Sequence, residues 1–324
     1  MRELRFAFLI VAVSAVQLCA KSPATHCQTS EQQSARSTDA LSGPLRVNVD
    51  EVVVTFNAVA SDGRPVHDLK AEEIRIRDNG LSPRRIVAFD QLTDRRLRVG
   101  ILLDTSESMQ PGLSSSKAIA EKFINQLFRP GVDEAFVASF GSVSELLQPW
   151  SGARAPVARA IQIASAKGSR LPGTALFNAV FQACSSSFRS VDQAATGNVI
   201  LLFSDGEDNA GRTSSDEAAR ACQKSNTEIF AFLSSTSSAH ASTGPKVLRE
   251  LVSKTGGRVF EGDDSEAAVQ RDLEEIESEM RNQYMLVYNP AELKHDGAFH
   301  DIELQPPDRV SRINVRSGYF APLR

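Results

Sequence analysis

The sequence lacks several features that would indicate nucleic-acid binding or a familiar class of enzyme. It contains no run of five or more basic residues, and its net charge is −4 at pH 7. A phosphate-binding surface therefore has no obvious source, which argues against a nucleic-acid partner. The Gly-x-Ser-x-Gly pattern of serine hydrolases is also missing. The five histidines are scattered, and none lies close in the sequence to an obvious nucleophile.

The first 20 residues have the pattern of a secretory signal peptide. Basic residues precede an apolar stretch, Phe6–Val16, and small residues follow it. The stretch is too short to span a bilayer comfortably, so we expect no transmembrane span in the mature chain. A lipoprotein anchor would require small residues directly before Cys19, and Gln17 and Leu18 fit that poorly. We therefore predict export to the periplasm, the cell surface or the medium.

Residues 21–44 have the composition of a disordered linker. They are rich in Ser, Thr, Gln and Ala, with almost no large apolar side chain to bury. Because such a segment cannot offset the entropy cost of folding, we expect a flexible tether between the signal peptide and the first ordered strand.

Residues 45–94 show the period-two alternation of β-strands. One predicted strand covers 52–59, and a second includes Ile76. A third, at 86–89, is expected to return after the turn at 78–80, because Asn and Gly tolerate positive φ. Three strands without a helix cannot readily close a core, so other strands must cover them.

The same alternation returns in residues 283–324. Strands are predicted at 284–288, at 300–304 and, as the last one, at 312–319. The simplest architecture is an all-β, immunoglobulin-like sandwich formed by both ends of the chain, with residues 95–282 inserted in it. Integrin β chains resemble this arrangement. The alternative is a separate β unit at each end.

Strand and helix patterns alternate over residues 95–282, which predicts an α/β fold with a doubly wound, mostly parallel sheet flanked by helices. The predicted strands are 99–103, 135–140, 146–150, 199–203, 229–233 and 258–261, and the predicted helices are 119–127, 157–164, 176–184, 216–223, 245–254 and 265–282. The strands at 99–103 and 199–203 are almost wholly apolar, as expected of central strands buried on both faces.

Oxygen-bearing side chains follow the first of these central strands. Asp104, Ser106 and Ser108 stand at i, i+2 and i+4 after the apolar run. In an open α/β sheet, ligands bind at the carboxyl ends of the strands. A loop that curls around one point would direct these oxygen atoms toward it. Mg²⁺ prefers such ligands, so the pattern predicts a divalent-cation site.

This stretch resembles the metal-ion-dependent adhesion site of the von Willebrand factor A domain family, which begins Asp-x-Ser-x-Ser. The family also has a threonine in a second loop and an aspartate after a later central strand, and Thr174 and Asp205 match them. The resemblance implies a Rossmann-like fold and a bound Mg²⁺, Mn²⁺ or Ca²⁺. Ser106, Ser108 and Thr174 would contact the metal, while Asp104 and Asp205 would hold its waters. The open coordination position would take a carboxylate from a partner protein.

Other functions remain open from the sequence. The metal could serve only to stabilise a scaffold. Phosphoryl transfer of the haloacid-dehalogenase type also uses an aspartate after the first strand, but it needs a second acid where Ser106 stands. The acidic pair Glu207 and Asp208 is interpreted as a solvated loop, with a second cation site as the alternative. The sequence carries no signal of oligomeric state.

Two further expectations concern the inserted region. Cys184 and Cys222 are its only cysteines and lie on consecutive predicted helices, so export would allow a disulfide between them. Buried free thiols are the alternative. The family resemblance also implies that ligand capture displaces the closing helix, 265–282, which would strain the strand that follows it. A rigid closing helix is the alternative.

Overall fold

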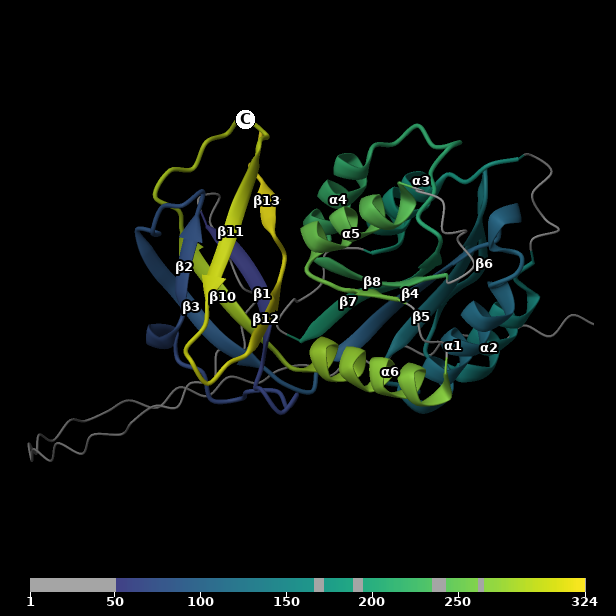
Figure 1. The fold of residues 1–324 in the computed structure, drawn as a ribbon, viewed down its shortest axis with the longest axis horizontal. Helices are drawn as coiled ribbons and strands as arrows, with labels where there is room; N and C mark the ends of the chain where they lie inside the picture. Colours follow the sequence, from purple (N-terminus) through teal and green to yellow (C-terminus); the bar gives the residue numbers. More distant parts are fainter. Residues whose placement is uncertain (1–50, 166–171, 189–194, 235–242, 262–264, 324) are drawn as a thin grey trace, which may run out of the picture. The chain divides into compact units, whose positions relative to one another are not determined.

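The computed structural model describes residues 51–165, 172–188, 195–234, 243–261 and 265–323. The predicted signal peptide and linker lie outside these residues. The largest sheet has six strands in the order β6-β5-β4-β7-β8-β9 (Figure 1). These strands are β4 (Arg96–Asp104), β5 (Glu134–Phe140), β6 (Ser144–Ser151), β7 (Thr196–Ser204), β8 (Thr227–Leu233) and β9 (Val259–Phe260). All neighbours are parallel except the antiparallel pair β5 and β6, which confirms the predicted doubly wound sheet.

Among the described residues, six α-helices cover the two faces of this sheet (Figure 1). They are α1 (Leu113–Gln126), α2 (Arg154–Ile163), α3 (Leu176–Gln182), α4 (Ser215–Lys224), α5 (Gly244–Thr255) and α6 (Glu266–Arg281). Helices α1, α2 and α6 share one hydrophobic core with the sheet, and α3, α4 and α5 share the other. Every residue of β7 is buried, which explains its continuous apolar sequence. Within the described ranges, no helix combines the length and apolar character needed to cross a membrane.

Two smaller antiparallel sheets form the predicted β-sandwich. Their orders are β12-β1-β10-β3 and β13-β11-β2. The strands are β1 (Val52–Val59), β2 (Arg75–Asp78), β3 (Arg85–Leu92), β10 (Gln283–Asn289), β11 (Phe299–Gln305), β12 (Arg312–Val315) and β13 (Gly318–Phe320). Each sheet combines strands from before and after the inserted region, and one hydrophobic core includes side chains of both sheets, such as Phe56, Leu286 and Ile302. The alternative of separate terminal β units is therefore wrong.

The strand connections within the sandwich differ from the prediction in two places. The turn after β2 forms, since Leu81 N donates to the Asp78 carbonyl at 2.9 Å. However, β2 pairs with β11 while β3 pairs with β10, so the returning strand joins the opposite sheet. The single last strand predicted at 312–319 is likewise divided into β12 and β13, in different sheets. Strands that cross between sheets form the corners of such sandwiches.

A buried ion pair fixes the end of α6. The Arg281 guanidinium donates to both carboxylate oxygens of Asp133, at 3.2 and 2.8 Å, and to the carbonyls of Arg95 and Leu127, at 2.9 and 3.0 Å. The side chains of Arg281 and Asp133 are 5% and 1% exposed. The helix therefore ends beside the strand with which the inserted region begins. Displacement of the closing helix, α6, remains a prediction. Such a displacement would have to move Asp133 together with the helix or break this ion pair.

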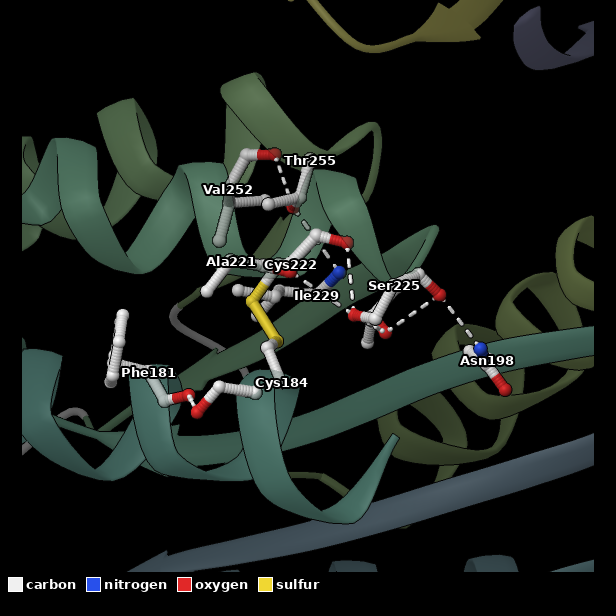
Figure 2. Close-up of a disulfide and its surroundings, with 11 residues drawn as sticks. Phe181, Cys184, Asn198, Ala221, Cys222, Ser225, Ile229, Val252 and Thr255 are labelled. Carbon is white, nitrogen blue, oxygen red and sulfur yellow. Dashed lines mark hydrogen bonds between the residues drawn. A yellow bond between two sulfur atoms is a disulfide. The ribbon is translucent and has the colours of Figure 1, made fainter. Parts of the chain in front are cut away.

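Cys184 and Cys222 form a disulfide between the helical turn η4 (Ala183–Ser187), which continues α3, and helix α4 (Figure 2). Their Cα atoms are 4.8 Å apart, and both side chains are buried. Beside the disulfide, Ser225 Oγ donates to the carbonyl of Cys222 at 3.1 Å (Figure 2). The bond therefore joins two helices that cover the same face of the six-stranded sheet.

Reduction of this disulfide should lower the free energy of unfolding by roughly 3 to 4 kcal/mol, because it releases a chain loop with a sequence separation of 38 residues. Urea denaturation with and without a reductant measures the difference. As a control, the double variant Cys184→Ala/Cys222→Ala should show no effect of the reductant. Equal unfolding midpoints for the oxidised and reduced wild type would contradict the prediction.

Candidate metal centre

The structure brings all five predicted metal-site residues to the same edge of the six-stranded sheet. Asp104 is the last residue of β4, and Asp205 directly follows β7. Since β4 and β7 are parallel neighbours, both aspartates lie at the carboxyl ends of adjacent strands. The Thr174 loop reaches this edge as well, because Ala175 N donates to the carbonyl of Gly141, just after β5, at 2.8 Å.

Asp104 is buried and held by its neighbours. One carboxylate oxygen accepts a hydrogen bond from Ser106 N at 2.9 Å, and the other accepts one from Ser204 Oγ at 2.8 Å. Ser204 Oγ also accepts from Gly206 N at 3.1 Å. Ser204 therefore links the two aspartate loops. The sequence analysis missed it, although a polar residue at the end of an apolar strand was a usable signal.

The hydroxyl groups continue from Asp104 toward solvent. The Oγ atoms of Ser106 and Ser108 are 3.2 Å apart, within hydrogen-bonding distance. The helical turn η2 (Glu107–Met109) curls the chain here, and Met109 N donates to the Ser106 carbonyl at 3.1 Å. Ser106 is buried and Ser108 is exposed, so this row of oxygen atoms is accessible at one end.

The Asp205 loop packs tightly against the start of α5. Glu207 N donates to the Asp205 carboxylate at 3.0 Å. Gly206 has a φ of +83°, and a Cβ atom added there would lie 2.4 Å from the Gly244 carbonyl oxygen. Only glycine fits this position without a shift of the backbone. The close contact between the two glycines therefore fixes the path of the chain that carries Asp205.

The electrostatics of the two aspartates favour a bound cation. The pKa of Asp104 is raised to about 6, mainly by burial and also by the charge of Asp205, while hydrogen bonds from Ser106 and Ser204 oppose the shift. In the described part of the chain, no basic side chain forms an ion pair with either aspartate. Two buried carboxylates beside neutral hydroxyls are an all-oxygen donor set that fits a hard divalent cation.

The donor set also limits which metals suit the site. Among the described residues, no three His, Cys, Asp or Glu side chains gather so that they could hold a metal ion. A site at this edge must therefore use the serine and threonine hydroxyls together with the two carboxylates. Softer transition metals prefer thiolate or imidazole ligands, which the five residues do not supply.

Asp208 has a different role from the solvated loop residue that was expected. It is half-buried, and its carboxylate accepts a hydrogen bond from Phe177 N, in the first turn of α3, at 3.3 Å. Burial raises the pKa of Asp208. The carboxylate thus binds a free backbone N–H at the start of a helix, as capping residues do.

Asn209 joins the Asp205 loop to the Thr174 loop. Thr174 N donates to Asn209 Oδ1 at 2.8 Å, and Asn209 N donates to the Thr174 carbonyl at 3.0 Å. A second link uses Asn178, whose side-chain oxygen accepts from the backbone N–H groups of Arg212 and Thr213 at 3.0 and 2.9 Å. These two asparagines were not predicted as site residues, because nothing local in the sequence indicates such pairs.

Replacement of Asn209 with alanine should lower the divalent-cation affinity about tenfold, since Thr174 loses the side chain that positions its backbone. Asn178→Ala is the matched control, because it removes two hydrogen bonds that join α3 to the chain after Asp205 but none at Thr174. Mn²⁺ titration calorimetry on both variants separates the effects. An equal loss of affinity would show that general loop stability, rather than the position of Thr174, controls binding.

Comparisons with known proteins find a family and several similar structures. A family model, the von Willebrand factor type A domain, matches residues 99–279. Among solved structures, BatB from Bacteroides thetaiotaomicron, a conserved hypothetical protein, is 20% identical over 56% of this chain and 97% of its own, with a TM-score of 0.46. Proximal thread matrix protein 1 from the mussel byssus is 15% identical over 62% of this chain and 50% of its own, with a TM-score of 0.47. No curated protein sequence matches. Because the family model covers more than half of its 324 residues, this chain belongs to the von Willebrand factor type A domain family.

Proposed function

We propose that this protein is an exported binding module that captures an acidic residue of a partner protein through a divalent cation. Asp104, Ser106, Ser108, Thr174 and Asp205 would hold the cation. The observation that carries the proposal is the pair of buried aspartates at adjacent strand ends, which lack a basic partner in the described residues and lie beside a row of hydroxyls that is accessible at Ser108.

The proposed division of the chain follows from its sequence. Residues 1–20 would be a signal peptide and residues 21–44 a disordered linker. Residues 45–94 and 283–324 would form the sandwich, and residues 95–282 the inserted A domain. Export is supported by the pattern of the leader alone.

The cation would be Mg²⁺, with Mn²⁺ or Ca²⁺ as alternatives, and it would act by attracting a carboxylate. Ser106, Ser108 and Thr174 are neutral, so they leave most of its charge uncompensated. Asp104 and Asp205 would hold its waters. A carboxylate of the partner would then be attracted strongly, because Coulomb forces are large at short range in a partly dry site.

No step of this proposal breaks a covalent bond. Aspartyl phosphoryl transfer would need an acid two residues after Asp104, where Ser106 stands. We therefore expect no turnover of phosphatase or esterase substrates.

The test combines cation binding with partner capture. Calorimetry should show that the mature chain binds one Mg²⁺ or Mn²⁺. Crosslinking to proteins of the native cell envelope should then give an adduct that a chelator abolishes and that Asp104→Asn does not form. A protein that binds the cation but forms the same adducts with and without chelator would be a scaffold with a purely stabilising metal. Failure to bind either cation would overturn the proposal.

Acid should weaken cation binding. The pKa of Asp104 in the metal-free protein is about 6, above its ordinary value of 3.8. Below this pH the carboxyl must lose its proton before it can hold the cation, so the affinity should fall about tenfold for each pH unit below 6 and stay level above 7. Mn²⁺ titrations across this range measure the slope. An affinity that is independent of pH would contradict the assignment of Asp104.

A further inference from the structure

A cavity of about 660 Å³ lies away from the candidate metal centre, and its lining combines charge with apolar surface. Helix α4 supplies Arg220 and Lys224, and the segment between β12 and β13 supplies Arg316. Val52 and the C-terminal residues Phe320 and Leu323 supply apolar surface. The volume falls within the range of about 300 to 1,000 Å³ that is typical of small-molecule sites.

None of the three basic side chains forms an ion pair within the described part of the chain. Arg220 donates to the Gly297 carbonyl at 3.1 Å, and its guanidinium lies 4.1 Å from the centre of the Phe320 ring. Arg316 donates to the Val53 carbonyl at 2.6 Å. Lys224 is exposed. Against these three cations, the cavity lining contains one acidic residue, Glu51.

The guanidinium of Arg316 is only partly satisfied by hydrogen bonds. Its Nε atom is buried without a hydrogen-bond partner. Burial also lowers its pKa, although the charge of Glu228 opposes the shift. The buried Arg281, by contrast, donates to both oxygens of Asp133. Arg316 is half-buried and has no carboxylate in hydrogen-bond contact, so an anion bound near it would be favourable.

The lining also contains residues that suit an apolar group. Val52, Leu293 and Pro322 contribute to it, and the side chain of Leu323 is exposed. A ligand with an anionic head group and an apolar body could therefore contact both the basic and the apolar residues of the lining.

We infer that this cavity binds a small amphipathic anion, with its carboxylate or phosphate group at Arg220, Lys224 and Arg316 and its apolar body against Val52, Leu293 and Leu323. Guanidinium groups bind both kinds of head group, because their donors match two acceptor oxygens at once. None of the residues involved belongs to the candidate metal centre, so the inference does not depend on the proposed function.

The experiment titrates the mature chain with decanoate, decyl phosphate, decanol and inorganic phosphate, each below the concentration at which it aggregates, by calorimetry. Decanoate or decyl phosphate should bind at least about tenfold more tightly than decanol and than inorganic phosphate. Decanol lacks the charged head group, and inorganic phosphate lacks the apolar body. Whichever of decanoate and decyl phosphate binds more tightly shows whether the cavity prefers a carboxylate or a phosphate head group.

Charge reversal at the cavity provides the second arm. Lys224→Glu should weaken binding of the preferred ligand at least about tenfold, and Arg316→Gln should do the same if it folds. Lys224 is exposed and has no hydrogen-bond partner among the described residues, so its variant should fold normally. The control is Arg159→Gln, which changes an exposed arginine on α2, on the other face of the sheet. Binding of decanol as tight as that of decanoate, equal affinities in Lys224→Glu and Arg159→Gln, or no binding of either amphipathic anion would each overturn the inference.

Discussion

Replacement of Asp104 with asparagine is expected to abolish divalent-cation binding while the metal-free protein becomes more stable. Affinity should fall by about 100-fold or more, because Asp104 is one of only two carboxylates at the candidate centre. In the metal-free protein the substitution should increase the free energy of unfolding, because the pKa of Asp104 is raised to about 6, mainly by burial. The ionised carboxylate therefore costs stability above that pH, and asparagine removes the charge.

The size of this gain has an upper limit. A shift from 3.8 to about 6 corresponds to at most about 3 kcal/mol. Asparagine also accepts fewer hydrogen bonds from Ser106 and Ser204, so we expect a net gain of about 1 to 2 kcal/mol near pH 7.5. Thermal unfolding with and without Mn²⁺ measures both effects. A variant that is less stable without metal and still stabilised by Mn²⁺ would contradict the assignment of Asp104.

A chain that ends at Arg281 is expected to lose the sandwich completely. It would lack β10, which pairs with both β1 and β3 and so lies in the middle of its sheet. It would also lack Tyr288 and Tyr319, whose hydroxyls both donate to the buried Asp78 carboxylate at 2.9 Å. The remaining strands would expose apolar faces and unpaired edges, so the fragment should aggregate.

The matched control is the inserted region alone, residues 95–282. Both hydrophobic cores of the six-stranded sheet lie within it, as does the ion pair of Arg281 with Asp133. This fragment should therefore fold and unfold cooperatively, as measured by circular dichroism during heating. A soluble fragment of residues 45–282 that shows a second cooperative transition for its N-terminal strands would count against a sandwich that needs both ends of the chain.

The sequence was sufficient to predict the parts of the fold that depend on local pattern. The apolar runs that end at Asp104 and before Asp205 predicted two buried parallel strands, and their strand ends are neighbours in the structure. Each predicted strand and helix of the inserted region has an observed counterpart. These predictions used two signals, the period of the apolar residues and the polar residues at strand ends. Each signal can be recognised from a few neighbouring positions in the sequence.

The features that could not be predicted depend on pairing between distant segments. Whether the strand after Asp78 pairs with its predecessor or joins the other sheet is decided by β10 and β11, more than 190 residues later. Asn209 binds Thr174 from 35 positions away, and no local motif accompanies it. The disulfide between Cys184 and Cys222 could not be predicted with certainty, because buried free thiols and bonded cysteines have the same sequence pattern.

The hydrogen bonds between Arg281 and Arg95 have a mechanical consequence. The inserted A domain begins and ends at one place, because Arg95 N donates to the Arg281 carbonyl at 3.3 Å and the Arg281 side chain donates back to the Arg95 carbonyl. A pull along the chain from β3 to β10 would therefore pass through this junction and leave the A domain unloaded. Tension that enters through a partner at Asp104 would instead run along β4 to Arg95 and Arg281 and into β10, the strand between β1 and β3. The junction, and not the closing helix alone, is where a tethered partner's load would reach the sandwich.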